Sequence, residues 1–140
     1  MNESTRQAPS IFPTFRYRDA SAMVEWLEKA LGFTAREKHM DGNRVAHAEM
    51  VLGASIVMLG DAADDAYGAM VGTSGATGGK STYIAVEDAT AAYEKAKDAG
   101  AEILQKLVER SYGSTEFICR DPEGNVWCVG TYWPKAGNVS

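Results

Sequence analysis

One pair of residues in the chain has the types and spacing that acid–base or metal chemistry would need. His47 and Glu49 lie two residues apart in a segment that we predict to be a strand, so their side chains would share one sheet face. They are a candidate acid–base pair or a replacement metal site. Two ligands on one strand do not complete a metal site, so a surface or hydrogen-bonded strand histidine is the favoured interpretation. The other histidine, His39, lies beside the turn signal Asp41-Gly42, and we expect it to be solvated.

Other candidates for chemistry are a glutamate and two cysteines. Glu116, like His47 and Glu49, is a residue around which an active site could be rebuilt. No serine stands in a Gly-x-Ser-x-Gly elbow, so a hydrolase triad is not indicated. Cys119 and Cys128 have no Cys-x-x-Cys spacing, which excludes a zinc knuckle or a redox motif. We expect both to be free thiols in a reducing cytosol, and the favoured interpretation is that they are small buried apolar residues.

Composition narrows the range of partners. The 140 residues suit a single compact domain, and the net charge of −5 comes without any cluster of Lys and Arg that would bind nucleic acid. No apolar run approaches the ~20 residues that a membrane-spanning helix needs. The first residues also lack the apolar stretch of a secretory signal, so we expect a cytoplasmic protein. The negative charge would favour a cationic ligand, although most acidic proteins are acidic for solubility.

An internal repeat organises the chain. Asp19 precedes a helical pattern that ends at Gly32, and Asp88 precedes a second one that ends at Gly100. Each Asp can accept hydrogen bonds from the free N–H groups of a first helical turn. Each Gly can adopt the left-handed conformation that closes a helix. Two capped amphipathic helices one repeat apart predict two copies of the same module.

Each predicted helix is surrounded by strand patterns, so each module reads β-α-β-β-β. The predicted strands are residues 11–17, 34–38, 45–51 and 55–59 in the first module and 81–86, 102–107, 115–119 and 126–129 in the second. We therefore predict one α+β domain over residues 1–140, with module 1 at about 11–60 and module 2 at about 80–134. The two tandem βαβββ modules would form a curved eight-stranded mixed sheet around a cavity, with the helices outside. The linker at about 61–79 is either plain and flexible, the favoured interpretation, or a lid carrying Tyr67 and Met70.

The repeat and several local strings resemble the vicinal oxygen chelate superfamily, which includes glyoxalase I, ring-cleaving dioxygenases and bleomycin-resistance proteins. The matching strings are Phe15-Arg16-Tyr17-Arg18-Asp19 before the first helix, Ala30-Leu31-Gly32-Phe33 at its end, Asp121-Pro122-Glu123-Gly124-Asn125 followed by Val126-Trp127, and the ending Gly130-Thr131-Tyr132-Trp133-Pro134. The resemblance covers about residues 11–134. It implies the cavity-forming fold described above and, from the metal-free members, a homodimer that binds a small molecule in a cleft.

The resemblance also implies where a metal would bind. The superfamily's metal enzymes place one His, Gln or Glu ligand on each of four inward strands. The matching positions here are Phe12, Met58, Ser81 and Cys128. A phenyl ring, a thioether and a hydroxyl do not supply the oxygen or imidazole donors that these metals need, and one thiol cannot hold a metal alone. The resemblance thus implies that the ancestral metal site and its Lewis acid are lost, and we expect neither a metal nor another cofactor.

Strand alternation extends these four positions into a predicted wall for a ligand. Thr14, Ile56 and Tyr83 would share the inward face, and Tyr112 and Trp133 add aromatic or polar groups nearby. Such a wall suits a flat or aromatic ligand held by stacking. The alternative, that these side chains fill the cavity as core, stays open. The predicted ligand-binding set is Phe12, Thr14, Ile56, Met58, Ser81, Tyr83, Tyr112, Cys128 and Trp133.

Three functional hypotheses follow. The leading one is a metal-independent protein that binds and sequesters an aromatic or cationic drug-like molecule, as bleomycin-resistance proteins do, without catalysis. The second is a glyoxalase-like lyase, isomerase or dioxygenase whose active site has been rebuilt around His47, Glu49 or Glu116. The third is a partner-binding module with a filled cavity. None of the three involves nucleic acid or a membrane.

Overall fold

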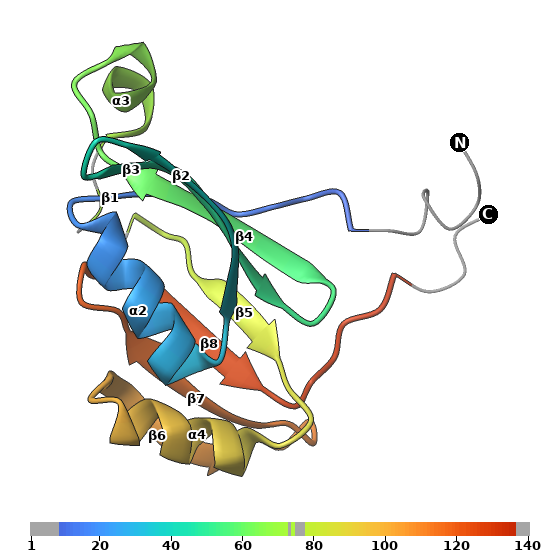
Figure 1. Cartoon of the computed structure of the whole chain (residues 1–140). Helices are drawn as coiled ribbons and strands as arrows, with labels where there is room; N and C mark the ends of the chain where they lie inside the picture. Colours follow the sequence, from blue (N-terminus) through green and yellow to red (C-terminus); the bar gives the residue numbers. More distant parts are fainter. Residues whose placement is uncertain (1–8, 73, 75–77, 137–140) are drawn as a thin grey trace. The chain divides into compact units, whose positions relative to one another are not determined.

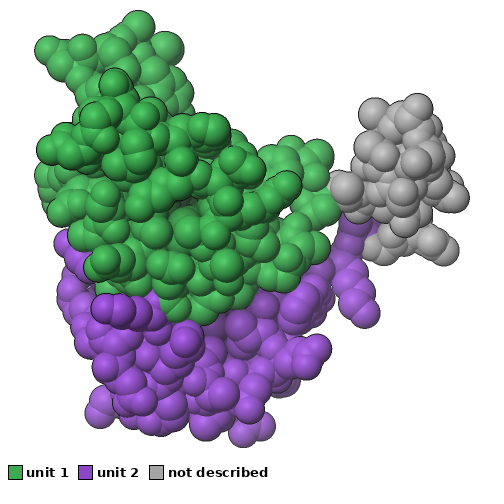
Figure 2. Space-filling view, in the orientation of Figure 1, with its two compact units in different colours: residues 1–28, 32–74 green, residues 29–31, 75–140 purple. Residues whose placement is uncertain are grey.

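The computed structural model describes residues 9–72, 74 and 78–136. The chain divides into two compact units, coloured separately in Figure 2. Unit 1 comprises residues 1–28 and 32–74, and unit 2 comprises residues 29–31 and 75–140. None of the helices in the described part of the chain is long and apolar enough to cross a membrane.

Unit 1 contains the first βαβββ module apart from residues 29–31 at the end of its helix (Figure 1). Its elements are β1 (Thr14–Tyr17), α2 (Ala20–Leu31), β2 (Thr34–Asp41), β3 (Arg44–Leu52) and β4 (Ser55–Asp61). The sheet order is β1-β4-β3-β2, with β1 and β4 parallel and the other pairs antiparallel. The mixed sheet and the element order confirm the prediction for this module.

Unit 2 repeats the same plan. Its elements are β5 (Thr82–Ala85), α4 (Ala89–Asp98), β6 (Glu102–Glu109), β7 (Thr115–Arg120) and β8 (Val126–Gly130). The order β5-β8-β7-β6, again with one parallel pair, matches that of unit 1. The α+β class and the tandem modules are thus confirmed. The strands belong to two four-stranded sheets, and the joining of these sheets around one cavity stays a prediction.

The predicted caps bound both helices. The side chain of Asp19 accepts a hydrogen bond from the backbone N–H of Ala22, and Asp88 accepts one from Ala91. Gly32 has φ of 81° and Gly100 has φ of 83°, the left-handed region in which glycine is favoured. These local signals fix where α2 begins and ends and where α4 begins.

One face of the sheet in unit 2 is covered by α4, which packs against β6, β7 and β8 (Figure 1). The ring of Tyr93 on α4 lies 5.2 Å from that of Phe117, and Phe117 and Trp127 are fully buried. Alternation along β7 and β8 then directs their other side chains to the opposite face. The candidate site is on that opposite face.

The turn between β7 and β8 is organised by one carboxylate. Asp121 is buried, and its Oδ1 accepts hydrogen bonds from the backbone N–H groups of Glu123 and Asn125, both at 3.0 Å. Its Oδ2 accepts a 3.1 Å hydrogen bond from Nε1 of the buried Trp127. The segment from Asp121 to Asn125, which the sequence predicts to be a turn, therefore also stabilises the buried Trp127.

The structure differs from the expected elements at two places. The first strand begins at Thr14 rather than Ile11, because Pro13 has no N–H to donate to a ladder, although its carbonyl accepts from Met58 N at 2.9 Å. The linker contains the short helix α3 (Ala66–Val71), which the sequence did not predict. Residues 73 and 75–77 of the linker lie outside the described residues, and a lid role for Tyr67 and Met70 stays a prediction.

Candidate functional site

The predicted ligand-binding residues of unit 1 lie close to one another in the sheet. Thr14 on β1 is the pairing partner of Met58 on β4, and Ile56 lies two residues from Met58 on the same face. Phe12 precedes β1 instead of lying in it. All four side chains are half-buried or exposed, so none of them is a filled core position.

The predicted residues of unit 2 form a second group. Tyr83 on β5 is the pairing partner of Cys128 on β8, just as Thr14 pairs with Met58 in unit 1. The thiol of Cys128 lies 3.9 Å from the hydroxyl of Ser81. Tyr112 lies in the loop between β6 and β7, and Trp133 follows β8. Whether the groups of the two units line one cavity stays a prediction.

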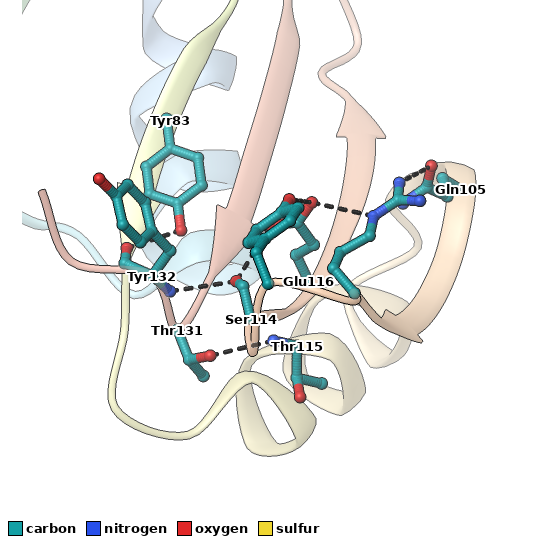
Figure 3. Close-up of polar contacts among 9 residues, drawn as sticks. Tyr83, Gln105, Ser114, Thr115, Glu116, Thr131 and Tyr132 are labelled. Atoms are coloured by element: carbon teal, nitrogen blue, oxygen red, sulfur yellow. Dashed lines mark hydrogen bonds and ion pairs between the residues drawn. The ribbon is translucent and has the colours of Figure 1, made fainter.

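A cluster of polar contacts lies around Glu116 on β7 (Figure 3). Oε1 of Glu116 accepts hydrogen bonds from the hydroxyl of Tyr112 at 2.7 Å and from Nε of Arg110 at 3.1 Å. Oε2 accepts a 3.0 Å hydrogen bond from the hydroxyl of Ser114. Nη2 of Arg110 in turn donates to Oε1 of Gln105 at 2.7 Å. These five residues, with Tyr83, are called the Glu116 cluster below.

The contacts shift the pKa values of the cluster. The hydrogen bond from Tyr112 is the main reason that the pKa of Glu116 lies below its ordinary value of 4.5, and Ser114 and Arg110 lower it further. The same bond raises the pKa of Tyr112 above 10.0. Partial burial raises the pKa of Tyr83. Near neutral pH the cluster therefore holds one carboxylate among protonated phenols. A carboxylate with both oxygens already accepting is better suited to orienting neighbours than to abstracting a proton.

The rings of Tyr83 and Tyr112 are exposed, but the hydroxyl group of each is fixed by a hydrogen bond. Tyr83 is 38% exposed, and its hydroxyl donates a 2.7 Å hydrogen bond to the carbonyl of Tyr132. Tyr112 is 64% exposed and is held by Glu116. Gly130 leaves room for this arrangement, because a Cβ at that position would lie 2.7 Å from the Tyr83 hydroxyl and 2.8 Å from Cβ of Glu116.

Sequence reasoning identified Tyr83, Tyr112 and Glu116 but missed the residues that hold them. Ser114 is buried and accepts a hydrogen bond from the backbone N–H of Tyr132 while donating to Glu116. Arg110 was not noticed either. Nearly every residue from 110 to 116 is polar, so no alternating pattern singles these two out.

The strand pair His47 and Glu49 has the predicted contact in unit 1. Nε2 of His47 lies 3.3 Å from Oε2 of Glu49, and both side chains are half-buried. His47 and Glu49 are in unit 1 and Glu116 is in unit 2. A catalytic role for any of these three residues stays a prediction.

The chain belongs to the Glyoxalase/Bleomycin resistance protein/Dioxygenase superfamily, whose family model matches residues 12–129. This is the superfamily that the repeat and the local strings indicated. Among curated proteins, the uncharacterized protein Rv0887c of Mycobacterium tuberculosis (strain ATCC 25618 / H37Rv) is 26% identical over 126 residues, which cover 87% of this chain and 74% of that protein.

Solved structures with the same fold include two bacterial examples. TioX from Micromonospora sp. ML1 has a TM-score of 0.71 at 23% identity and covers 90% of this chain and 100% of its own. A glyoxalase/bleomycin resistance protein/dioxygenase family enzyme from Burkholderia phytofirmans PsJN has a TM-score of 0.66 at 21% identity, covering 85% and 94%. At these identities the likeness establishes the fold alone.

The donor set at the four ancestral metal positions does not fit the superfamily's metal. In unit 1 the positions are Phe12 and Met58, which offer a phenyl ring and a thioether. In unit 2 they are Ser81 and Cys128, a hydroxyl and a thiol 3.9 Å apart. These groups do not provide the carboxylate or imidazole ligands that such divalent metals need. We therefore assign no metal to these four positions.

Proposed function

We propose that this protein binds a small molecule carrying a flat aromatic or cationic group, and that it acts by sequestration rather than by covalent chemistry. The observation that carries this proposal is the pair of exposed tyrosine rings, Tyr83 and Tyr112, whose hydroxyl groups are tied by 2.7 Å hydrogen bonds. A ring that is already held loses little side-chain freedom when a ligand stacks on it. Exposed aromatic surface also gains free energy when a ligand covers it.

Charge supports an aromatic cation over an aromatic anion. Glu116 is ionised between the two phenols, and the chain as a whole has a net charge of −5. Tyrosine faces attract cations through the ring quadrupole. Arg110 compensates part of the carboxylate charge, so stacking would supply most of the affinity and charge would supply selectivity.

The rest of the predicted wall belongs to the same proposal. Ser81, Cys128 and Trp133 in unit 2 would extend the surface beside Tyr83, and the corresponding group in unit 1 comprises Phe12, Thr14, Ile56 and Met58. We propose that ligand contacts at these positions involve no metal.

We also propose a cytoplasmic homodimer with two equivalent clefts. Multi-angle light scattering of the purified chain is the direct test of the dimer.

The binding proposal is tested by isothermal titration calorimetry with three probes. They are proflavine (a flat aromatic cation), anthracene sulfonate (a flat anion) and tetramethylammonium (a cation without a ring). We expect saturable binding of proflavine, weaker binding of the anion and none of the small cation. Tyr83→Ala and Tyr112→Ala should each weaken proflavine binding about tenfold, or about 1.4 kcal/mol.

Met40→Ala is the control, because Met40 is a large apolar side chain exposed on β2 in unit 1, outside the predicted ligand-binding set. It should leave proflavine binding unchanged. An equal loss of affinity in Met40→Ala, or no saturable binding by any aromatic probe, would contradict the proposal. Circular dichroism of each variant separates lost binding from lost folding.

A further inference from the structure

The pairing of β2 with β3 places four ligand-type side chains on one sheet face in unit 1. His39 lies directly opposite His47, and Glu37 lies directly opposite Glu49. Residues opposite each other in an antiparallel pair share a face, and so do residues two apart on one strand. The four residues Glu37, His39, His47 and Glu49 are called the His–Glu quartet below. None of them is at an ancestral metal position.

Distances within the quartet are short enough for its members to act together. The two imidazole rings lie 6.0 Å apart, centroid to centroid. On each strand the histidine approaches its own glutamate, with Nε2 to Oε2 distances of 3.3 Å for His47–Glu49 and 3.7 Å for His39–Glu37. The four side chains are between 26% and 65% exposed, so an ion from solvent can reach them.

Two carboxylates directly opposite each other across a strand pair are unfavourable unless a cation lies between them. The quartet has that unfavourable pair beside two imidazoles. Among the described residues, no three His, Cys, Asp or Glu side chains are already arranged as a metal site. Each imidazole instead turns to the carboxylate on its own strand. The Cβ atoms of directly opposite residues lie about 4.5–5.5 Å apart, so a shared ion would require the side chains of His39 and His47 to rotate toward each other.

We propose that the His–Glu quartet binds one divalent transition-metal ion of the zinc type. Imidazole nitrogen with carboxylate oxygen is a donor set that Zn²⁺ accepts and that the harder ions Ca²⁺ and Mg²⁺ do not favour. The site lies wholly in unit 1 and does not depend on the tyrosine rings of unit 2.

The test is calorimetric titration of ZnCl₂ into the full, untagged chain, with NMR of the imidazole C–H signals. The chain has two histidines, both in the quartet, so every imidazole signal reports on this site. We expect one Zn²⁺ per chain and a shift of both signals. His39→Gln, His47→Gln and Glu49→Gln should each weaken binding by about tenfold or more.

Two matched controls keep the result specific. Glu102→Gln removes an exposed strand carboxylate that pairs with Arg120 in unit 2, and Cys128→Ser removes the accessible thiol. Both should bind Zn²⁺ as the unchanged chain does. The proposal is overturned if binding is not saturable, if it survives both histidine substitutions, or if Cys128→Ser abolishes it.

Discussion

The phenol of Tyr112 donates a hydrogen bond of 2.7 Å to Oε1 of Glu116, four residues further along the chain. This contact is the main cause of the lowered pKa of Glu116 and of the raised pKa of Tyr112. A loop residue outside any strand thereby lowers the pKa of a strand residue. It also holds an exposed aromatic ring in a defined position, which is the basis of the proposed binding surface.

The first prediction concerns stability at both ends of the pH range. Because the pKa of Glu116 is lowered in the fold, its contribution is present above pH 4.5 and is lost as the pH falls through the native pKa. Because the pKa values of Tyr112 and Tyr83 are raised, their contribution is present below pH 10.0 and is lost as the pH rises through the native values. Urea unfolding at several pH values should therefore show stability falling below pH 4.5 and above pH 10.0.

Tyr112→Phe should flatten both of these slopes, since it removes the phenol and lets the pKa of Glu116 return toward 4.5. Tyr67→Phe, which removes a phenol in unit 1, should leave the Glu116 titration unchanged. NMR titration of the Glu116 carboxyl carbon measures this pKa directly. Identical Glu116 pKa values in the unchanged chain and in Tyr112→Phe would rule out the assigned cause.

The second prediction concerns the carboxylate under Trp127. Asp121→Ala should lower the free energy of unfolding by about 2–4 kcal/mol, because Trp127 Nε1 and two turn N–H groups lose a charged acceptor. Urea unfolding followed by tryptophan fluorescence measures this change. Asp41→Ala, an aspartate at the exposed β2–β3 turn, should change the value by less than about 0.5 kcal/mol. Equal effects of the two substitutions would show that Asp121 does not support the tryptophan.

The third prediction concerns the space beside Tyr83. Gly130→Ala places a Cβ where the Tyr83 hydroxyl and Glu116 lie, and we expect a cost of about 1–3 kcal/mol in stability. It should also weaken proflavine binding, because the Tyr83 ring loses its tie to Tyr132. Adding Tyr83→Phe should recover part of the stability by removing the atom at 2.7 Å. Strictly additive effects in this double-mutant cycle would mean that the two residues are not coupled.

The fourth prediction concerns the thiols. Burial raises the pKa of Cys119 to about 12, whereas Cys128 is half-buried. At pH 8, iodoacetamide should modify Cys128 quickly and Cys119 only after unfolding, because the thiolate is the nucleophile. Mass spectrometry of the native protein should find one modified thiol. Cys128→Ser should abolish the fast reaction and Cys119→Ser should not. The reverse result would refute the assignment.

Local patterns in the sequence determined most of the fold. Asp19 and Asp88 begin their helices through contacts with residues only three positions away, and Gly32 ends α2 through its own backbone conformation. Such signals need no knowledge of the rest of the chain. The same holds for the Asp-Pro-Glu-Gly-Asn turn, although the sequence did not predict the hydrogen bond from Trp127 to Asp121.

The short helix α3 is an element that local sequence patterns did not predict. Six residues containing Gly68 have little helical propensity in isolation. Gly68 is nevertheless suited to its position, since a Cβ there would collide with the carbonyl of Ala63. Arg16 on β1 supports the helix by an ion pair with Asp65 at 3.5 Å and by lying 5.1 Å from the Tyr67 ring centre. Such contacts between distant segments cannot be read from propensity.

The sequence by itself therefore determined the tandem modules and their capped helices, because these depend on residue identity and short-range contacts. Only the tertiary structure decided which chemical groups meet. The pairing of Glu37 and His39 with Glu49 and His47 depends on a strand register that two irregularities in the β2–β3 ladder shift. The ties of Tyr83 and Ser114 to Tyr132 likewise depend on how β5, β7 and β8 align. Register is set by the packing of whole strands, so no single motif encodes it.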